Sequence, residues 1–275
     1  MNTMKWLTSA LLFLMAVQTP AYGRRAVLMT YYGTNNDAAR RLTTDALTRM
    51  MTDSLAGVTV AEAYTSSMVV DALRKKGVRK PLVGEALDSL RALGCDTVVV
   101  ANCQLLDGVM TRDVERSIAA HAEGLTVSLT RPLLYNSEDC RWLAGVVTTR
   151  LAGEASGQVV LVGHGSDDSA NAMYALFDYV LQHSGHTRFH VGTLENYPDL
   201  GAVEDILGRT GDTRVTLYPL LLIAGNHALH DIKGEWRRRL EDKGYQVDVV
   251  GEGLLELPDV KGRILDQVRR TMMDM

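Results

Sequence analysis

The sequence predicts an α/β protein made of two similar domains, each built on a mostly parallel sheet, with a cleft between them. Three observations lead to this prediction. Short apolar runs of strand length alternate with segments of helical periodicity along the chain. Two of these runs, at 159–163 and 218–225, end in glycine and then present a histidine. The first and second halves of the chain also resemble each other.

The similarity of the halves rests on two alignments. Gly33 and Thr34 align with Gly165 and Ser166, each pair after an apolar run, and residues 98–108 align with 215–225, both ending in glycine. This pattern favours a duplicated domain. The alternative is that any two doubly wound halves look alike at this level.

The expected strands are apolar runs bounded by glycine or polar residues. They are residues 26–32, 58–63, 97–103, 159–162, 189–191, 215–223 and 247–250. Helices are expected where apolar residues recur every three or four positions, as at Ala39, Leu42 and Ala46. They are residues 36–55, 68–76, 84–93, 169–183, 202–208 and 228–243. This alternation predicts parallel strands joined by crossover helices.

Residues 1–23 are predicted to be a secretory signal peptide. Lys5 supplies a positive charge, residues 6–17 are mainly apolar, and Ala21 and Gly23 suit the cleavage site. The apolar stretch is too short to cross a membrane as a helix, which needs about 20 residues. We therefore expect cleavage after Gly23 and an exported, periplasmic protein.

The rest of the chain is long enough for two α/β domains with cores of their own. We expect an N-terminal domain over 24–150 and a C-terminal domain over 151–275. The formal net charge is −4 and no basic stripe occurs, which argues against nucleic acid as a partner. Of the three cysteines, Cys95 and Cys103 suit buried apolar positions, although export would allow one disulfide.

His164 lies between Gly163 and Gly165 directly after a predicted strand. Ligands of α/β sheets gather outside the carboxyl ends of the strands, where an imidazole can bind a metal or move protons near neutral pH. The glycines permit a tight turn and the close approach of a flat ligand. A single histidine there is ordinarily a satisfied polar residue, but a second such histidine in the same half favours a functional site.

The residues after His164 leave one alternative open. Ser166, Asp167 and Asp168 can cap the following helix, whose start is also a possible phosphate cradle. The two aspartates would repel an anion, so we do not favour the cradle. The sequence Gly-His-Gly-Ser is also not the nucleophile elbow of serine hydrolases.

The second histidine, His227, lies at a strand-to-helix junction, with His230 and Asp231 close behind. Residues three apart share a helix face, so a two-histidine pair is conceivable, as is a role for Asp231 in orienting an imidazole. Glu195 follows another predicted strand and is expected at the same sheet edge. Two histidines and one carboxylate form a plausible open metal site.

Three further histidines lie near one another in sequence, His183, His186 and His190. We interpret them as the solvated end of a helix. Metal contact by this cluster is the alternative.

Taken in order, these motifs resemble those of the anaerobic cobalt chelatases, the sirohydrochlorin cobaltochelatase family of CbiK type. The stretches that carry the resemblance are 33–34, 62–66, 131–135, 163–166, 191–198 and 218–228. Each is weak alone, but the ordered set is specific and spans nearly the whole chain after residue 23.

The resemblance implies two Rossmann-like domains with a tetrapyrrole in the cleft between them. It implies that His164 and His227 bind the metal and act in catalysis, with Glu195 as the acidic metal ligand. It further implies that the substrate binds near the loops after the strands at 26–32 and 159–162. The residues concerned are Gly33, Thr34, Gly163, Gly165 and Ser166. The expected partners are a sirohydrochlorin-like tetrapyrrole and Co²⁺ as the substrate metal, with no organic cofactor, while Fe²⁺, Ni²⁺ and a homo-oligomer stay open.

The chain departs from the family pattern after the strand at 97–103. Gln104 occupies the position where the family typically has histidine, and Val109 and Met110 occupy positions that are typically acidic. Haem ligation, which the histidine would permit, is therefore not expected. Arg74, Lys75 and Lys76 are candidates for binding the substrate carboxylates by charge alone.

Three functions fit these features. The first is an exported chelatase that inserts Co²⁺ into sirohydrochlorin. The second is an exported carrier of tetrapyrrole or metal that kept the fold and lost turnover, which Val109 and Met110 favour. The third is a periplasmic ligand-binding protein of two α/β lobes, which would not require histidines at the strand ends.

Overall fold

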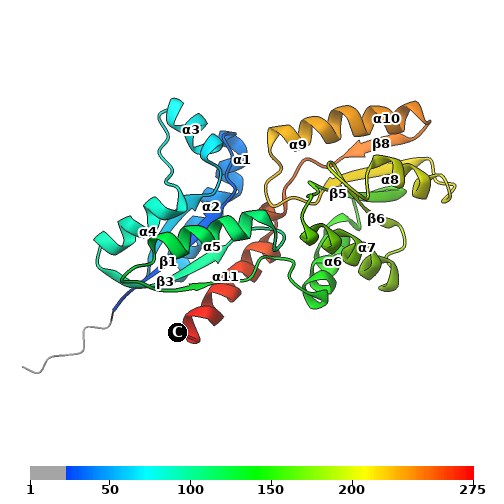
Figure 1. Cartoon of the computed structure of the whole chain (residues 1–275). Helices are drawn as coiled ribbons and strands as arrows, with labels where there is room; N and C mark the ends of the chain where they lie inside the picture. The colour runs from blue at the N-terminus through cyan, green and yellow to red at the C-terminus, as the bar shows by residue number, and fades with distance from the viewer. Residues whose placement is uncertain (1–22) are drawn as a thin grey trace, which may run out of the picture.

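The computed structural model describes residues 23–275, without the side chains of 226–228, and shows two lobes side by side (Figure 1). The predicted signal peptide therefore lies outside the described residues, apart from Gly23. None of the described helices is long and apolar enough to cross a membrane.

The first lobe is built on a four-stranded parallel sheet. Its strands, in spatial order, are β2 (Thr59–Tyr64), β1 (Arg24–Tyr31), β3 (Cys95–Asn102) and β4 (Thr126–Leu129). The central strands β1 and β3 are buried over most of their length, which explains their continuous apolar sequences. The helices are α1 (Asp37–Leu42), α2 (Thr44–Ser54), α3 (Ser67–Lys75), α4 (Val83–Ala92) and α5 (Val109–His121).

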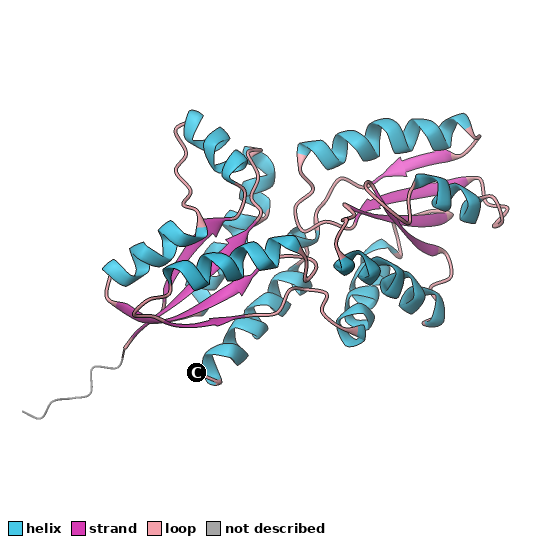
Figure 2. Ribbon diagram, viewed as in Figure 1, coloured by secondary structure: helices cyan, strands magenta, loops and turns pink. Residues whose placement is uncertain are grey.

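The second lobe repeats this architecture. Its parallel sheet contains, in spatial order, β6 (Phe189–Thr193), β5 (Gln158–Gly163), β7 (Arg214–Pro219) and β8 (Gln246–Val249). Its further elements are η1 (Ser169–Asn171), α7 (Ala172–His183), α8 (Leu200–Leu207), α9 (Asn226–Asp231), the π-helical turn η2 (Ile232–Trp236) and α10 (Arg237–Asp242). Both sheets thus have the same strand order, and the predicted class of two parallel-sheet α/β domains is confirmed (Figure 2).

Two helices tie the lobes together. The helix α6 (Ser137–Leu151) packs against α7 of the second lobe, whereas α11 (Pro258–Met273), the last helix, packs against β3 of the first (Figure 1). One hydrophobic cluster contains side chains of both sheets and both helices, among them Val27, Val159, Val147 and Ile264. The lobes therefore share a core on this side.

Several element boundaries differ from the sequence prediction. The helix expected over 36–55 is two helices, because Thr43 leaves helical geometry with φ −112° and ψ −89°. The strand expected over 215–223 stops at Pro219, which has no N–H to donate to a ladder. Five elements had no counterpart in the prediction, namely α5, β4, α6, the short 3₁₀ turn η3 (Leu254–Glu256) and α11. Of these, β4 is short and only partly buried, so its sequence carries little strand signal.

The three cysteines are buried free thiols. Burial raises the pKa of the Cys103 thiol far above its usual range and that of Cys140 to about 11. They fill the interior as small apolar groups, as expected for Cys95 and Cys103, and none forms a disulfide in this structure.

Candidate functional site

The sheet edge of the second lobe brings His164 and Glu195 together. Strands β5 and β6 are parallel neighbours that pair Gly163 with Thr193; His164 is the next residue after β5, and Glu195 is the second residue after β6. The Glu195 N–H donates to the His164 carbonyl oxygen at 2.8 Å. The ring Nδ1 of His164 lies 3.8 Å from Oε2 of Glu195, and the two side chains are 60% and 65% exposed. Both are therefore available to a ligand outside the strand ends.

The two glycines that flank His164 are required by packing. Gly165 has φ +86°, and a Cβ on it would lie 1.6 Å from the carbonyl oxygen of Glu195. A Cβ on Gly163 would lie 2.3 Å from the ring of Tyr174, which is buried beneath the loop. The Gly-His-Gly sequence thus allows the loop to lie against its neighbours while the imidazole points outward.

The start of the following helix is not free to bind phosphate. The Ser166 N–H donates to Asn171 Oδ1 at 2.9 Å, and the Asp168 N–H donates to Ser166 Oγ at 3.1 Å. The Ala170 N–H donates to the Asp168 carboxylate, and this bond together with Arg112 lowers the pKa of Asp168. Three backbone donors are therefore engaged beside an ionised carboxylate, which argues against the phosphate cradle.

Glu195 lies at the start of a tight turn. The Thr193 N–H donates to the Pro198 carbonyl at 2.7 Å, Asn196 has φ 64°, and the Tyr197–Pro198 peptide is cis. The Asn171 side chain also donates to the Tyr197 carbonyl at 2.7 Å. Asn171 thus joins the His164 loop to the Glu195 turn. The sequence analysis missed it, because an asparagine in a polar loop carries no distinctive signal.

His227 lies in the first turn of α9, and its side chain is outside the described residues. The expectation that His227 binds the same metal ion as His164 therefore stays a prediction. Among the side chains that the structure describes, no three histidine, cysteine, aspartate or glutamate residues form a metal-binding group. His230 is exposed on α9.

The prediction that three histidines form the solvated end of a helix is partly wrong. His183 and His186 do follow this description, since His183 is the exposed last residue of α7 and His186 lies in the loop after it. His190 instead lies on β6, is 6% exposed, and bonds Gln158 through Nε2 at 2.8 Å. His190 lies within the strand expected over 189–191, but the sequence does not show that both faces of this strand are buried.

The first lobe contains the same backbone frame with different side chains. Tyr31 pairs with Tyr64 as Gly163 pairs with Thr193, so Tyr32 follows β1 as His164 follows β5. The Ser66 N–H lies 3.4 Å from the Tyr32 carbonyl oxygen, which matches the bond from Glu195 to His164. The first lobe therefore has no imidazole or carboxylate at these two positions.

The same correspondence extends to the third candidate ligand. Thr30 pairs with Asn102 as Val162 pairs with Pro219, which aligns 98–108 with 215–225 as the sequence suggested. Met110 then corresponds to His227. It contacts Thr65 through sulfur at 3.8 Å, and Val109 beside it is exposed. A metal site of this composition is thus available only to the second lobe.

Gly33 and Thr34 shape the corresponding turn of the first lobe. Gly33 has φ +98° and faces the Tyr64 ring, while Thr34 is buried and its hydroxyl accepts from the Asn36 N–H at 3.2 Å. Of the basic residues expected to bind the substrate carboxylates, Lys76 contacts this turn, because its Nζ donates to the Asn35 carbonyl at 2.6 Å. Arg74 instead pairs with Asp71 on its own helix.

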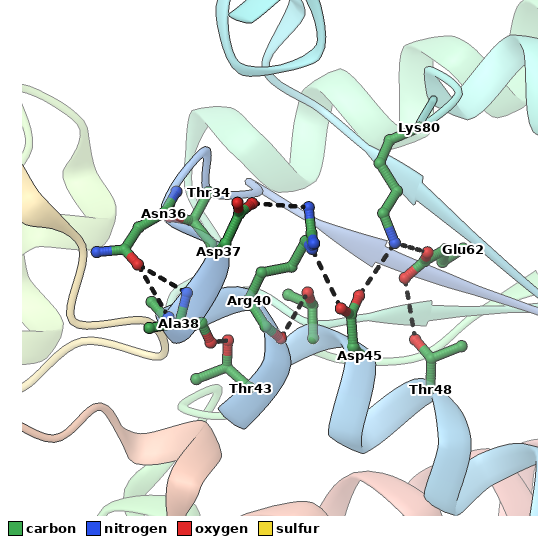
Figure 3. A network of polar contacts seen from close by, with 12 residues as sticks. Thr34, Asn36, Asp37, Ala38, Arg40, Thr43, Asp45, Thr48, Glu62 and Lys80 are labelled. Carbon is green, nitrogen blue, oxygen red and sulfur yellow. Dashed lines mark hydrogen bonds and ion pairs between the residues drawn. The ribbon is translucent and has the colours of Figure 1, made fainter. Parts of the chain in front are cut away.

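A half-buried polar network lies next to this turn (Figure 3). Lys80 forms ion pairs with Asp45 and Glu62, and Arg40 bonds the other oxygen of Asp45 at 3.1 Å. Lys80 also lies 5.8 Å from the centre of the Tyr64 ring. The network links α2, β2 and the loop before α4, so it fixes the tyrosine that Gly33 contacts.

The two lobes meet at the site through an ion pair. Arg112 on α5 of the first lobe bonds Asp168 in the loop that carries His164. Gln104, which precedes α5 in the chain, is buried, and its Nε2 has no hydrogen-bond partner among the described residues. The sequence analysis did not single out Arg112, because a charge on an amphipathic helix is ordinarily a solvated face.

Comparison with known proteins places these features in a family. Residues 25–273 match the family model described as cobalt chelatase (CbiK). The chain is 26% identical over 258 residues to the sirohydrochlorin cobaltochelatase of Salmonella typhimurium, covering 90% of this chain and 97% of the relative. It is 27% identical over 243 residues to the sirohydrochlorin cobaltochelatase CbiKC of Nitratidesulfovibrio vulgaris, covering 85% of each.

Solved structures show the same fold at lower identity. SirB from Bacillus subtilis with Fe³⁺ is 17% identical and superposes with a TM-score of 0.69, covering 90% of this chain and 95% of the other. CbiX, described as the terminal enzyme of sirohaem biosynthesis in denitrifying bacteria, is 14% identical with a TM-score of 0.55, covering 90% and 98%.

Proposed function

This chain belongs to the cobalt chelatase (CbiK) family, and on that premise we propose that it inserts Co²⁺ into sirohydrochlorin. The observation that carries the proposal is the juxtaposition of His164 and Glu195, 3.8 Å apart and exposed at the carboxyl ends of β5 and β6. An imidazole and a carboxylate that lie this close together can bind the same metal ion, and each can also accept a proton. His227 is proposed as the third ligand.

The reaction exchanges one metal ion for two protons. Two pyrrole N–H bonds of the ring break and the two protons leave, and Co²⁺ then binds all four ring nitrogens, two of them through the lone pairs that the protons leave behind. A neutral imidazole can accept one of these protons and also bind the incoming ion. The Glu195 carboxylate offsets the charge of the ion before the ring takes it.

An open site suits this task, because the ion must be released to the ring. Two or three protein ligands leave coordination positions for water and then for pyrrole nitrogen. Such a site differs from a closed structural metal site, where four protein ligands hold the ion.

The test is anaerobic mixing of the purified protein with Co²⁺ and sirohydrochlorin while the absorbance of the ring is followed. We expect the metallated spectrum to form faster than in a protein-free control. The variant His164→Ala should react at the protein-free rate. A wild-type rate equal to that control contradicts the proposed activity.

A second function, a carrier of ring or metal without turnover, is favoured by one observation. Met110 and Val109 provide no metal ligand where the family is typically acidic, so metal affinity rests on the second lobe alone. A carrier would bind Co²⁺ and sirohydrochlorin in equilibrium measurements and leave the insertion rate unchanged. The assay above therefore separates the two functions.

We also propose that the protein acts after export, with residues 1–23 removed. The support is the sequence alone: the charge at Lys5, the apolar segment and the small residues before position 24. Intact-mass measurement of protein from a periplasmic extract tests it. A mass that includes residues 1–23 contradicts cleavage.

A further inference from the structure

The loop that follows β7, residues 220–225, leads directly into α9 and His227. It is held by the segment before α11, residues 251–257, which we call the supporting segment. Two consecutive N–H groups of the supporting segment, those of Leu254 and Leu255, donate to carbonyl oxygens of the loop at 2.8 and 2.9 Å. Two adjacent backbone bonds fix both the position and the direction of the loop.

The supporting segment also contacts the loop through Gly253, which is buried. A Cβ on this residue would lie 2.6 Å from the backbone nitrogen of Ala224 and 2.8 Å from the carbonyl oxygen of Leu222. The φ angle of Gly253 is −97°, which any L-residue adopts. Glycine is therefore required here by the close approach of the two backbones, and the position of one sets the position of the other.

Glu252 ties the supporting segment to the helix α6, which itself packs against α7. Its Oε1 lies 2.7 Å from Nε of Arg150 in the last turn of α6, and the two side chains are only 21% and 28% exposed. The same guanidinium pairs with Glu154, which is 58% exposed, at 2.8 Å. Burial, together with the nearby charge of Glu252, raises the pKa of Tyr218 on β7. Glu252 thus lies between α6 and the end of β7, where the loop to His227 begins.

We propose that Glu252 and Gly253 are positioning residues for the metal site: they hold the loop 220–225, and with it the backbone of His227, in place before the ion arrives. The inference rests on the proposed function, in which His227 is the third metal ligand. A ligand that is already held in place loses little freedom when it binds, so the affinity of the site for Co²⁺ rises. Glu252 acts through Arg150 and the loop backbone, and not as a ligand of the ion.

Hydrogen exchange of the metal-free full chain tests how the loop is held. In Glu252→Gln we expect amides of residues 220–230 to exchange roughly fivefold faster, the size of a partly exposed ion pair, while the amides of β1 are unchanged. Glu154→Gln is the matched control, because it removes the other partner of Arg150 and should leave exchange in 220–230 as in wild type. No change in Glu252→Gln, or equal changes in both variants, overturns the inference whether or not the protein is a chelatase.

Co²⁺ titration of two glycine variants tests the link to the metal. Gly253→Ala must displace the loop, so we expect the Co²⁺ affinity to fall roughly tenfold and the visible absorption of bound Co²⁺ to change as in His227→Ala. Gly251→Ala is the control, because its Cβ would meet the flexible end of the Lys233 side chain at 3.3 Å. If His227→Ala weakens binding and Gly253→Ala does not, the inference is overturned and the metal site stands. Wild-type affinity in His227→Ala instead overturns the proposed third ligand, and the inference fails with it.

Discussion

The N–H of Glu195 donates a hydrogen bond of 2.8 Å to the carbonyl oxygen of His164, while their side chains meet at 3.8 Å. The backbone bond continues the β5–β6 ladder beyond the last paired residues, so it sets the spacing of the two candidate ligands. A rigid strand pair thus positions two residues of the proposed metal site, whose side chains remain exposed. The exposed side chains carry the proposed chemistry, whereas the backbone ladder holds the lobe together. Substitution of these side chains should therefore change function and leave the fold intact.

Glu195→Gln should weaken Co²⁺ binding more than loss of any other single carboxylate. The amide keeps the shape of the side chain and removes its charge, so we expect a loss of roughly tenfold or more, the size that outer-shell changes already cause. Calorimetric titration of Co²⁺ measures it. Glu154→Gln, an exposed carboxylate in the loop after α6, is the matched control. Equal affinity in Glu195→Gln and wild type would show that the metal binds elsewhere.

His164→Ala should abolish metal insertion with little loss of stability. The side chain is 60% exposed, and exposed substitutions usually change stability by about 0.5 kcal/mol or less. The insertion assay and urea unfolding measure the two effects. His183→Ala, at an exposed histidine on α7, should leave the insertion rate unchanged. A large loss of stability in His164→Ala would mean that the imidazole supports the fold.

Gly165→Ala should cost more stability than Gly211→Ala. Both glycines have positive φ, +86° and +75°, which costs an L-residue about 1–2 kcal/mol. A Cβ at Gly211 meets nothing within 4 Å, whereas one at Gly165 would lie 1.6 Å from the Glu195 carbonyl oxygen. The backbone must therefore move in Gly165→Ala and separate His164 from Glu195. Urea unfolding and Co²⁺ titration of both variants would test this, and equal losses would argue against it.

Arg112→Gln should lower the efficiency of metal insertion while the fold stays intact. This residue joins α5 of the first lobe to the loop that carries His164, and exposed ion pairs contribute about 1 kcal/mol at most to stability. We expect the Michaelis constant for the ring to rise and the rate to lose part of its salt dependence. Arg116→Gln is the control, because Arg116 pairs with Asp113 on its own helix. Identical behaviour of the two variants would remove the role assigned to Arg112.

The stability of the protein should fall on acidification because of His190. Burial lowers the pKa of this imidazole below its usual 6.5. Below that pH the unfolded chain takes up a proton that the folded chain does not, so the free energy of unfolding decreases until the folded pKa is reached. Urea unfolding between neutral pH and pH 5 measures the slope. His190→Gln should flatten it, and His183→Gln serves as the control. A slope unchanged in His190→Gln would assign it to other groups.

The α/β class and most of the strands can be predicted from the residues alone. The buried strands β1, β3 and β5 are continuous apolar runs, and the Gly-His-Gly segment marks the end of β5 because only glycine fits beside Tyr174 and Glu195. The correspondence of the halves was also readable, since Gly33 and Gly165 both require positive φ. These features are local, because each depends on the types of a few residues that are close together in the sequence.

Contacts between residues far apart in the chain, in contrast, depend on how the strands and helices pack together. The strand order sets Glu195 beside His164, the crossing of α6 and α11 merges the two cores, and Arg112 reaches Asp168 from the other lobe. The tertiary fold also places His190 inside, because both faces of β6 are covered, which the residue types of this short strand do not reveal. Such contacts join residues far apart along the chain, and their free energy depends on packing that neither residue type nor local periodicity encodes.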